Sequence, residues 1–192
     1  MQRENGIVIG IVADLDDPLK LGRARVRLPH LDDQLSDWAR IASPMGGKHR
    51  GWFLRPEVDD EVLVLFEQGD PRRANIVGAF WSSADPPPAD DGKPRENNWR
   101  FFCSRSGHVL KFDDTSGAEC VEIIGKDSKQ RISIDVSGEK IAICCTSGDI
   151  ALSAPSGTLT LDAQKIEIHA STSMSLKADA DMTIKGLSVA IN

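Results

Sequence analysis

Neighbouring acidic residues are the first candidates for catalytic chemistry in this sequence. They occur at Asp32 and Asp33, at residues 59–61, and at Asp113 and Asp114. Glycoside hydrolysis needs two carboxylates that face each other across a cleft, and adjacent residues do not provide that arrangement. Each group lies beside turn-forming residues, where short polar side chains usually build turns. We therefore expect these carboxylates to shape loops.

The serine, histidine and cysteine residues form no catalytic or metal-binding pattern either. Ser106 precedes His108 without a G-x-S-x-G nucleophile elbow. Strand alternation places His108 on the same face as Leu110 and Phe112, which indicates a packed or interface histidine. None of the four cysteines lies in a C-x-x-C motif, so we expect free thiols that pack as small hydrophobic groups. We predict no enzymatic activity, no catalytic residue, no metal and no cofactor.

Composition narrows the class of protein further. The chain has 192 residues, a net charge of −6, 40% hydrophobic residues and no Tyr among only 5% aromatic residues. The acidic balance argues against general attraction to nucleic acid or to anionic lipid. The first five residues are polar and resemble no signal peptide. We expect a protein that is synthesised in the cytoplasm.

The first 82 residues read as short strands separated by turn residues. Alternating or continuous apolar segments lie at residues 7–13, 23–28, 38–42, 61–66 and 76–80. No segment shows a convincing period of 3.6 residues, so helix is scarce. Five strands in about 80 residues suit a small closed barrel such as the OB fold. The sequence predicts an OB-like barrel at residues 1–82, a Pro-rich linker at 83–98 and connecting strands at 99–130.

Three arginines alternate with apolar residues along the second predicted strand, and OB barrels often bind single-stranded nucleic acid near this position. The arginines are Arg23, Arg25 and Arg27, and no aromatic residue lies between them. We interpret the row as a solvated or subunit-contact face, so no nucleic-acid partner is expected. A module that binds single-stranded nucleic acid or a glycan through its OB fold stays as the alternative function.

The last third of the chain repeats a pattern of apolar, polar, apolar, polar and small residues. The pattern defines eight runs between residues 132 and 191, spaced by five to nine residues. The large apolar side chains of the first seven runs form a predicted trimer core: Ile132, Ile134, Ile141, Ile143, Ile150, Leu152, Leu159, Leu161, Ile166, Ile168, Met174, Leu176, Met182 and Ile184. One chain cannot close around so narrow an apolar stripe, whereas three chains can enclose a common axis. We therefore predict an intertwined trimeric β-helix or β-prism at residues 131–192.

Several stretches resemble phage baseplate assembly protein V and the related spike proteins of contractile tails, injection particles and type VI secretion systems. They are GIVIG at 6–10, DP at 17–18, GRARVR at 22–27, PEVDDEVLVLFE at 56–67, GDPR at 69–72 and SGHVLKFDD at 106–114. The likeness extends over nearly the whole chain. It implies an all-β fold, with an N-terminal OB barrel followed by a C-terminal trimeric spike.

The resemblance also implies a function and a set of partners. A homotrimer would stand on the axis of the baseplate of a virion or phage-tail-like particle, in contact with hub and tube-side proteins. Contraction of the sheath would drive it through a target membrane. Residues 186–192 lack the His-x-His pair that holds an iron ion in some relatives. Instead, we expect a PAAR-like tip protein to contact Leu187, Val189, Ile191 and Asn192.

Overall fold

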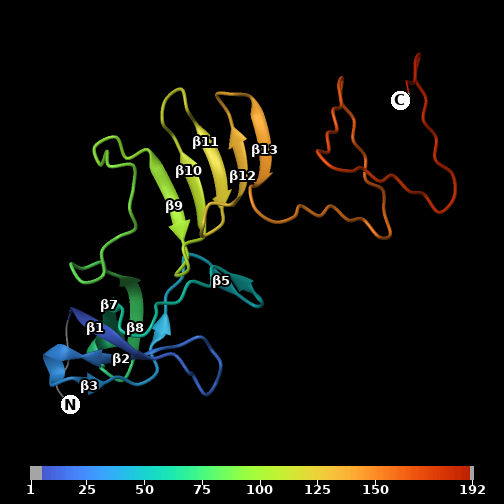
Figure 1. Ribbon diagram of the computed structural model, residues 1–192. Coiled ribbons are helices and arrows are strands. Elements are labelled where there is room, and N and C mark those ends of the chain that lie inside the picture. Colours follow the sequence, from blue (N-terminus) through green and yellow to red (C-terminus); the bar gives the residue numbers. More distant parts are fainter. Residues whose placement is uncertain (1–5, 191–192) are drawn as a thin grey trace.

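The computed structural model describes residues 6–190 and consists almost entirely of β-strands and loops (Figure 1). Two sheets follow one another along the chain, and an extended C-terminal segment leaves the second sheet. Within the described range, the helical elements are two short 3-10 helices, η1 (Pro29–Leu31) and η2 (Glu67–Gly69). The predicted all-β class with an N-terminal barrel agrees with this arrangement.

The first sheet has six strands in the order β3-β2-β1-β7-β8-β4. These strands are β1 (Ile7–Asp14), β2 (Arg25–Leu28), β3 (Gln34–Leu35), β4 (Arg40–Ile41), β7 (Glu61–Phe66) and β8 (Ala74–Ala79). All five strands predicted for this part of the chain are present, although β2 and β4 are shorter than expected and β8 begins two residues earlier.

A backbone bridge closes this sheet into a barrel. Strand β4 pairs with β8 in parallel, and Ala39, immediately before β4, bridges to Ala24, immediately before β2. The Ala24 N–H donates to the Ala39 carbonyl at 3.0 Å, and the Ala39 N–H donates back at 2.7 Å. Because β2 and β4 lie on opposite sides of the sheet order, this pair of hydrogen bonds completes the circle.

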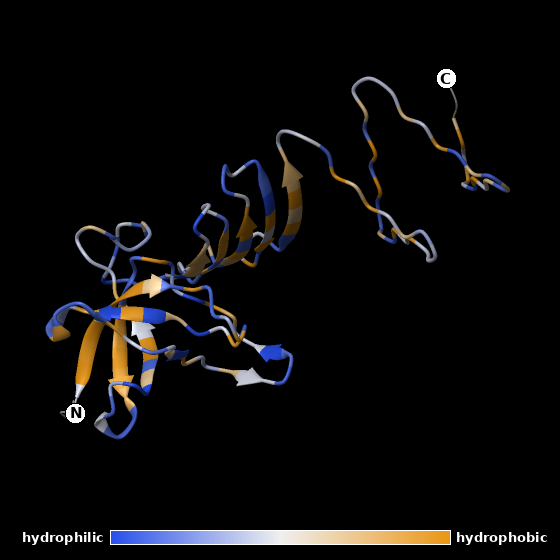
Figure 2. Cartoon of the chain, turned by 90° about the horizontal axis from the view of Figure 1, so that it is seen from below, coloured by the Kyte–Doolittle hydropathy of each residue, from blue (hydrophilic) through white to orange (hydrophobic). Residues whose placement is uncertain are grey.

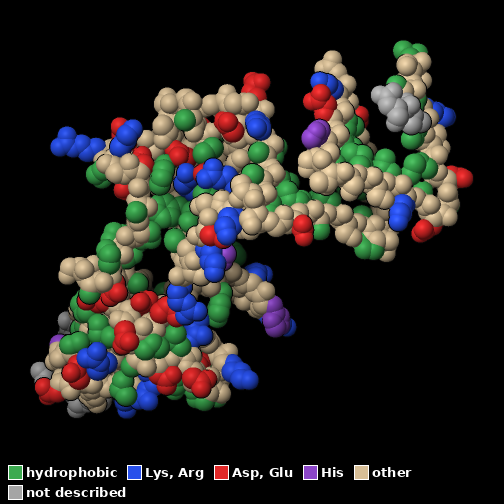
Figure 3. All heavy atoms as spheres, viewed as in Figure 1, with side chains coloured by type: hydrophobic (Ala, Val, Ile, Leu, Met, Phe, Trp, Pro, Cys, Tyr) green, Lys and Arg blue, Asp and Glu red, His purple; other side chains and the backbone are tan. Residues whose placement is uncertain are grey.

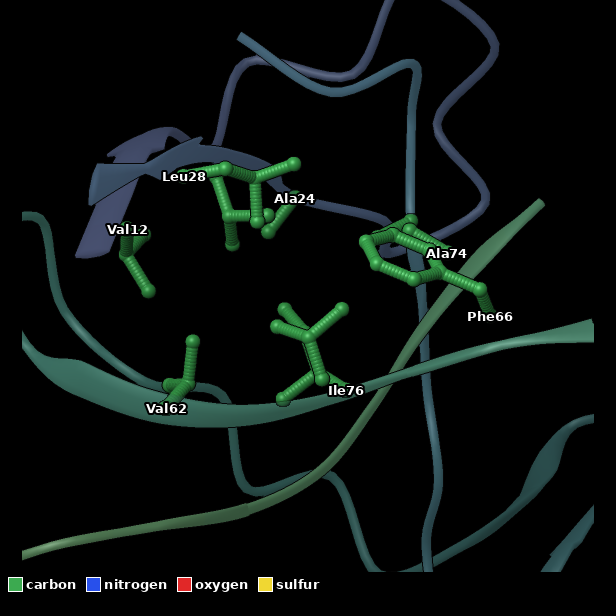
Figure 4. Close-up of a cluster of buried hydrophobic side chains, with 10 residues drawn as sticks. Val12, Ala24, Leu28, Val62, Phe66, Ala74 and Ile76 are labelled. Carbon is green, nitrogen blue, oxygen red and sulfur yellow. The ribbon is translucent and has the colours of Figure 1, made fainter. Parts of the chain in front are cut away.

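Alternating side chains fill the barrel. Inward-facing residues of β1, β2, β7 and β8 include Val12, Leu28, Val62 and Ile76, each no more than 2% exposed (Figure 4). Full burial of one such side chain is worth about 1.5–3 kcal/mol. A Cβ at Gly10 would lie 3.1 Å from a Val64 methyl group, so glycine at this position leaves room for a side chain of the neighbouring strand β7.

A small hairpin, which the sequence analysis did not predict, projects from the barrel. It consists of β5 (Gly46–Gly47) and β6 (Arg50–Gly51). Gly51 has a φ of +146°, and a Cβ there would lie 2.5 Å from the Met45 carbonyl oxygen, so the hairpin requires glycine. The residues that follow it, Trp52–Leu54, are at least half exposed.

The second sheet is a five-stranded antiparallel meander in which every strand pairs with its neighbours in sequence. Its strands are β9 (Trp99–Cys103), β10 (Val109–Asp113), β11 (Cys120–Ile124), β12 (Gln130–Asp135) and β13 (Lys140–Cys145). Residues 82–98, between the two sheets, contain no strand and are largely exposed. The Trp52 ring meets the Phe102 ring edge-on at 5.7 Å, and Arg105 pairs with Glu57 at 3.0 Å, so the two sheets touch.

The C-terminal segment contains no strand between residues 146 and 190. Two of the eight predicted runs are therefore strands here, namely β12 and β13. The six runs that begin at residues 150, 159, 166, 174, 182 and 187 lie in extended, exposed chain, and Figure 3 shows their hydrophobic side chains uncovered along it. These runs pair with no strand edge in the described structure, and the trimeric β-helix stays a prediction. Ile191 and Asn192 lie outside the described residues.

Candidate functional site

One face of the second sheet is apolar and uncovered. The strand register aligns Phe102, Leu110, Ile123, Ile132 and Ile143 in one row across all five strands. Their exposed fractions lie between 38% and 59%. Such a continuous row is unusual on a monomer surface and marks an interaction site.

A second row lies beside the first on the same face. It contains Phe112, Val121, Ile134 and Ile141, of which Ile141 is 73% exposed. We call these two rows together the apolar face. Figure 2 shows hydrophobic and hydrophilic colours alternating along β10–β13, as a sheet with one apolar side requires.

The apolar face is also hollowed at the end nearer the barrel. A cleft of about 700 Å³ is lined by Phe102, Leu110, Ile123 and Ile132, together with Leu54 from the segment that follows the β5–β6 hairpin. Leu54 is 61% exposed. The barrel thus extends the apolar surface of the sheet instead of covering it.

The opposite face carries charged residues that satisfy one another. Lys111 Nζ lies 2.8 Å from Glu122 and 3.5 Å from Asp113, and Arg131 lies 3.2 Å from the other Glu122 oxygen. The Lys111 ammonium also lies 4.2 Å from the centre of the Trp99 ring, within cation–π range. Lys111, Asp113 and Glu122 have side chains at most 12% exposed. This face needs no additional partner.

Protonation states on the charged face follow from the same contacts. Burial pushes the pKa of Lys111 down, but the hydrogen bond and charge of Glu122 outweigh it, and the pKa lies above its ordinary value. Burial likewise pushes the pKa of Asp113 up, yet hydrogen bonds from Thr115 outweigh it and the pKa is lowered. Burial raises the pKa of the Cys120 thiol on the same face. Lys111 and Asp113 are therefore charged at neutral pH, with a protonated Cys120 thiol beside them.

The predicted core residues divide between the sheet and the C-terminal segment. The structure brings Ile132, Ile134, Ile141 and Ile143 together, because Ile132 pairs with Ile143 and Ile134 pairs with Ile141. The ten predicted core residues from Ile150 to Ile184 are at least half exposed and are not gathered into one surface. Two of the predicted tip contacts, Leu187 and Val189, are exposed in the same segment.

The sequence analysis missed five members of the apolar face: Phe102, Leu110, Phe112, Val121 and Ile123. Alternation placed Leu110 and Phe112 on one strand face, but only the register shows that β9–β11 continue the rows of β12 and β13. The signal that was available is the single-residue polar spacing in Leu110-Lys111-Phe112 and Val121-Glu122-Ile123, which repeats the later pattern.

The acidic groups that were considered for catalysis lie in turns or ion pairs. Asp32 and Asp33 both have left-handed backbone conformations. Asp113 accepts hydrogen bonds from the Thr115 hydroxyl and N–H, while Asp114 pairs with Arg100 at 2.7 Å. These positions agree with a role in shaping loops.

His108 and the acidic residues do not assemble a metal centre in the described part of the chain. The Lys126 N–H donates to Nδ1 of His108 at 3.2 Å, which fixes this histidine at the end of β10. Among residues 6–190, no three His, Cys, Asp or Glu side chains gather as a metal site. No helix in this range is long and apolar enough to cross a membrane.

A buried carboxylate organises the loop between β1 and β2. The Asp17 side chain is 3% exposed and forms a bidentate ion pair with Arg23. It also accepts hydrogen bonds from the backbone N–H groups of Leu19 and Leu21. The Arg23 hydrogen bonds hold the pKa of Asp17 far below its ordinary value, against the effect of burial. The Asp-Pro pair of the resemblance is therefore a loop anchor in this structure.

The arginine row of β2 has an aromatic neighbour that the sequence analysis did not foresee. The guanidinium carbons of Arg23 and Arg25 lie 5.9 Å and 6.0 Å from the centre of the Trp38 ring. Trp38 is 13 residues beyond Arg25 in the sequence and reaches it through the bridge between Ala24 and Ala39. This contact could be predicted only from the closure of the barrel.

The barrel is of a known class. Residues 8–81 match the protein family described as "Type VI secretion system/phage-baseplate injector OB domain". Over this part the chain is similar to injector OB domains, and the resemblance proposed from the sequence is confirmed for residues 8–81.

Relatives that match the chain include type VI secretion system spike proteins and an actin cross-linking toxin. The chain is 35% identical over 85 residues to the type VI secretion system spike protein VgrG5 of Pseudomonas aeruginosa, covering 42% of this chain and 11% of that protein. It is 32% identical over 111 residues to the spike protein VgrG4b of the same species, covering 52% and 14%. It is 26% identical over 106 residues to the actin cross-linking toxin VgrG1 of Vibrio cholerae, covering 51% and 10%. The chain thus spans less than a sixth of the length of each of these relatives.

Proposed function

We propose that this protein is a structural spike protomer of a contractile tail or injection system. Three copies would form a homotrimer at the baseplate and pierce the target cell envelope when the sheath contracts. The spike would act mechanically and without enzymatic activity. The match of residues 8–81 to the injector OB domain and the similarity to VgrG spike proteins support this class of function.

The observation that carries the proposal is the apolar face. Its two rows hold nine apolar side chains, from Phe102 to Ile143, on one side of a sheet whose other side is satisfied by its own ion pairs. Around a threefold axis, three such faces can bury one another. Burial at about 25 cal/mol per Å² of apolar surface makes this the largest available gain for the second sheet.

The free strand edges also favour assembly between chains. Strands β9 and β13 lie at the two ends of the sheet order, and within the described residues no strand pairs with their outer edges. Exposed edges promote pairing with other chains. The six repeated runs after residue 149 would continue the pattern of β12 and β13 as further strands of the trimer, which would be the predicted β-helix.

The resemblance to spike proteins also implies neighbouring proteins for the proposed spike. The barrel would contact the hub and tube-side proteins, and the end of the spike, including Leu187 and Val189, would contact a PAAR-like tip protein. The protein would be synthesised in the cytoplasm and would meet a target membrane only during contraction.

Light scattering coupled to size-exclusion chromatography tests the homotrimer directly. We expect a mass three times the 20.9 kDa of one chain. The double variant Ile132→Asp/Ile143→Asp places carboxylates in the apolar face and should shift the protein to monomers or aggregates. Leu19→Asp, a change at an equally exposed aliphatic residue of the β1–β2 loop, should leave the trimer intact. A monodisperse monomer of the unmodified chain, with slowly exchanging amides in residues 132–190, would exclude the proposal.

A further inference from the structure

A second cleft lies on the barrel, away from the apolar face. It opens between the start of β2, strand β4 and the connection from β7 to β8, and its volume is about 610 Å³. Leu21, Trp38 and Ile41 form an apolar part of its lining, while Arg40 and Arg73 stand beside Glu67 in another part. The proposed trimer contacts do not involve this cleft.

The two arginines of the cleft share one carboxylate. Arg40 lies 3.5 Å from one Glu67 oxygen, and Arg73 lies 3.4 Å from the other. Arg40 Nε also donates to Asn75 Oδ1 at 3.1 Å. Tight charge-assisted hydrogen bonds measure about 2.7–2.9 Å, so neither arginine is tightly paired with Glu67. The Arg40 and Arg73 side chains are 71% and 54% exposed. Two positive charges against one negative charge leave room for a second carboxylate.

The apolar part of the cleft is held in place by neighbouring contacts but remains exposed to solvent. Leu21 is 68% exposed, although its N–H is fixed by the buried Asp17 carboxylate at 2.8 Å. Trp38 is half-buried and is positioned by the neighbouring bridge at Ala39 and by the arginines beside its ring. A preorganised apolar surface lowers the entropy cost of binding an apolar side chain.

We propose that this cleft binds a short acidic peptide segment of a partner protein, in which a carboxylate side chain stands next to a bulky apolar one. The carboxylate would bridge Arg40 and Arg73, whose planar guanidinium groups suit carboxylate oxygens. The apolar side chain would pack on Leu21 and Trp38. The site is separate from the trimer interface and adds a protein-recognition role to the barrel.

A peptide fits the charges of this surface better than a nucleic acid does. Arg27 pairs with Asp33 at 2.9 Å, Arg72 pairs with Asp70 at 2.9 Å, and Arg23 is engaged by Asp17. A phosphate chain that followed the arginines would pass these carboxylates and Glu67. A single carboxylate at Arg40 and Arg73 avoids all of them except Glu67.

Fluorescence anisotropy with the full-length protein tests the proposal. The probes are a labelled peptide of sequence LDLEL, its neutral counterpart LNLQL, and a single-stranded thymidine oligonucleotide of about 12 nucleotides. We expect the acidic peptide to bind, the neutral peptide to bind at least about tenfold more weakly, and the affinity to fall between about 50 and 300 mM NaCl.

Variants locate the binding. The double variant Arg40→Gln/Arg73→Gln should lower the affinity for the acidic peptide by about tenfold or more. Leu21→Ser should lower it by about three- to tenfold. Arg95→Gln in the exposed linker removes one positive charge elsewhere and should change the affinity less than twofold. Circular dichroism and the oligomeric mass of each variant confirm that the fold is kept. Equal binding of LNLQL, no binding of LDLEL, or binding of the oligonucleotide alone that depends on Arg40 and Arg73 would each overturn the proposal.

Discussion

In the barrel and in the second sheet, alternate side chains form an apolar face. The barrel buries this face, whereas the second sheet leaves it exposed. In the barrel, ten hydrophobic residues are buried, because the sheet closes on itself through the bridge between Ala24 and Ala39. In the described second sheet, the charged Glu122 is buried at 7% exposure, while the isoleucines of β12 and β13 are exposed. An apolar stripe therefore predicts that its side chains are buried. If the sheet closes on itself, the chain buries them alone; if it stays open, the proposed trimer would have to bury them.

The largest expected effect is a loss of stability after substitution of a buried residue in the barrel. Ile76→Ala should lower the free energy of unfolding of the barrel by about 2–5 kcal/mol, because it leaves a cavity in a closed core. Urea denaturation followed by tryptophan fluorescence measures this effect. The loss should not depend on protein concentration, since the barrel core lies within one chain. A strong concentration dependence would mean that the barrel also requires partner copies.

The matching change on the apolar face should act through assembly. Ile143→Ala removes three carbon atoms from the proposed interface and should weaken association by about 2 kcal/mol per chain. Sedimentation equilibrium measures the association, and the effect should appear as a stronger dependence of the melting temperature on protein concentration. Unchanged association would show that the apolar face is not the contact between copies.

The charged face should respond to loss of one partner in its network. Glu122→Gln leaves the Lys111 ammonium without its 2.8 Å partner in a site that is 12% exposed, and should destabilise the sheet by about 1–3 kcal/mol. Asp114→Asn breaks the exposed pair with Arg100 and should cost less than about 0.5 kcal/mol. Thermal unfolding of the two variants in parallel separates the effects. Equal losses would contradict the interpretation of Lys111 and Glu122 as a buried pair.

The smallest expected effect is a loss of barrel stability in acid, which acts through Asp17. The folded-state pKa of Asp17 lies below its ordinary value of 3.8, so its contribution to stability is present above that pH and is lost as the pH falls below it. Acid titration of the unfolding free energy should therefore show a decline below about pH 4 that is reduced in Asp17→Asn. Asp16→Asn, in the same loop, serves as the control and should keep the decline.

The sequence predicted the barrel well because its physical signals are local. Strands β1 and β7 are almost continuous apolar runs, and turn-forming residues such as Asp17-Pro18 and Gly69-Asp70-Pro71 bound them. The β5–β6 hairpin was missed because its Gly46–Gly47 strand carries no apolar pattern. The closure at Ala24 and Ala39 was missed because a single bridge leaves no periodic signal.

The candidate interface was only partly predictable for a related reason. Ile132, Ile134, Ile141 and Ile143 were placed together from their spacing, and the register confirms that they share a face. The pairing of Lys111 with Glu122 depends on which strands are neighbours, and spacing alone does not give that. The runs after residue 149 form no strands in the structure, and their predicted place in a trimer stays a prediction.

The strictly sequential order of the second sheet determines how it can form during synthesis. Each strand from β10 to β13 pairs with the strand made just before it, so all its contacts are short in sequence. Ribosomes add about 5–20 residues per second, and hairpins form in about microseconds, so each strand can dock as it emerges. The nascent chain can therefore complete this sheet alone, whereas in the proposed trimer the segment after β13 would form its strands only after released copies meet.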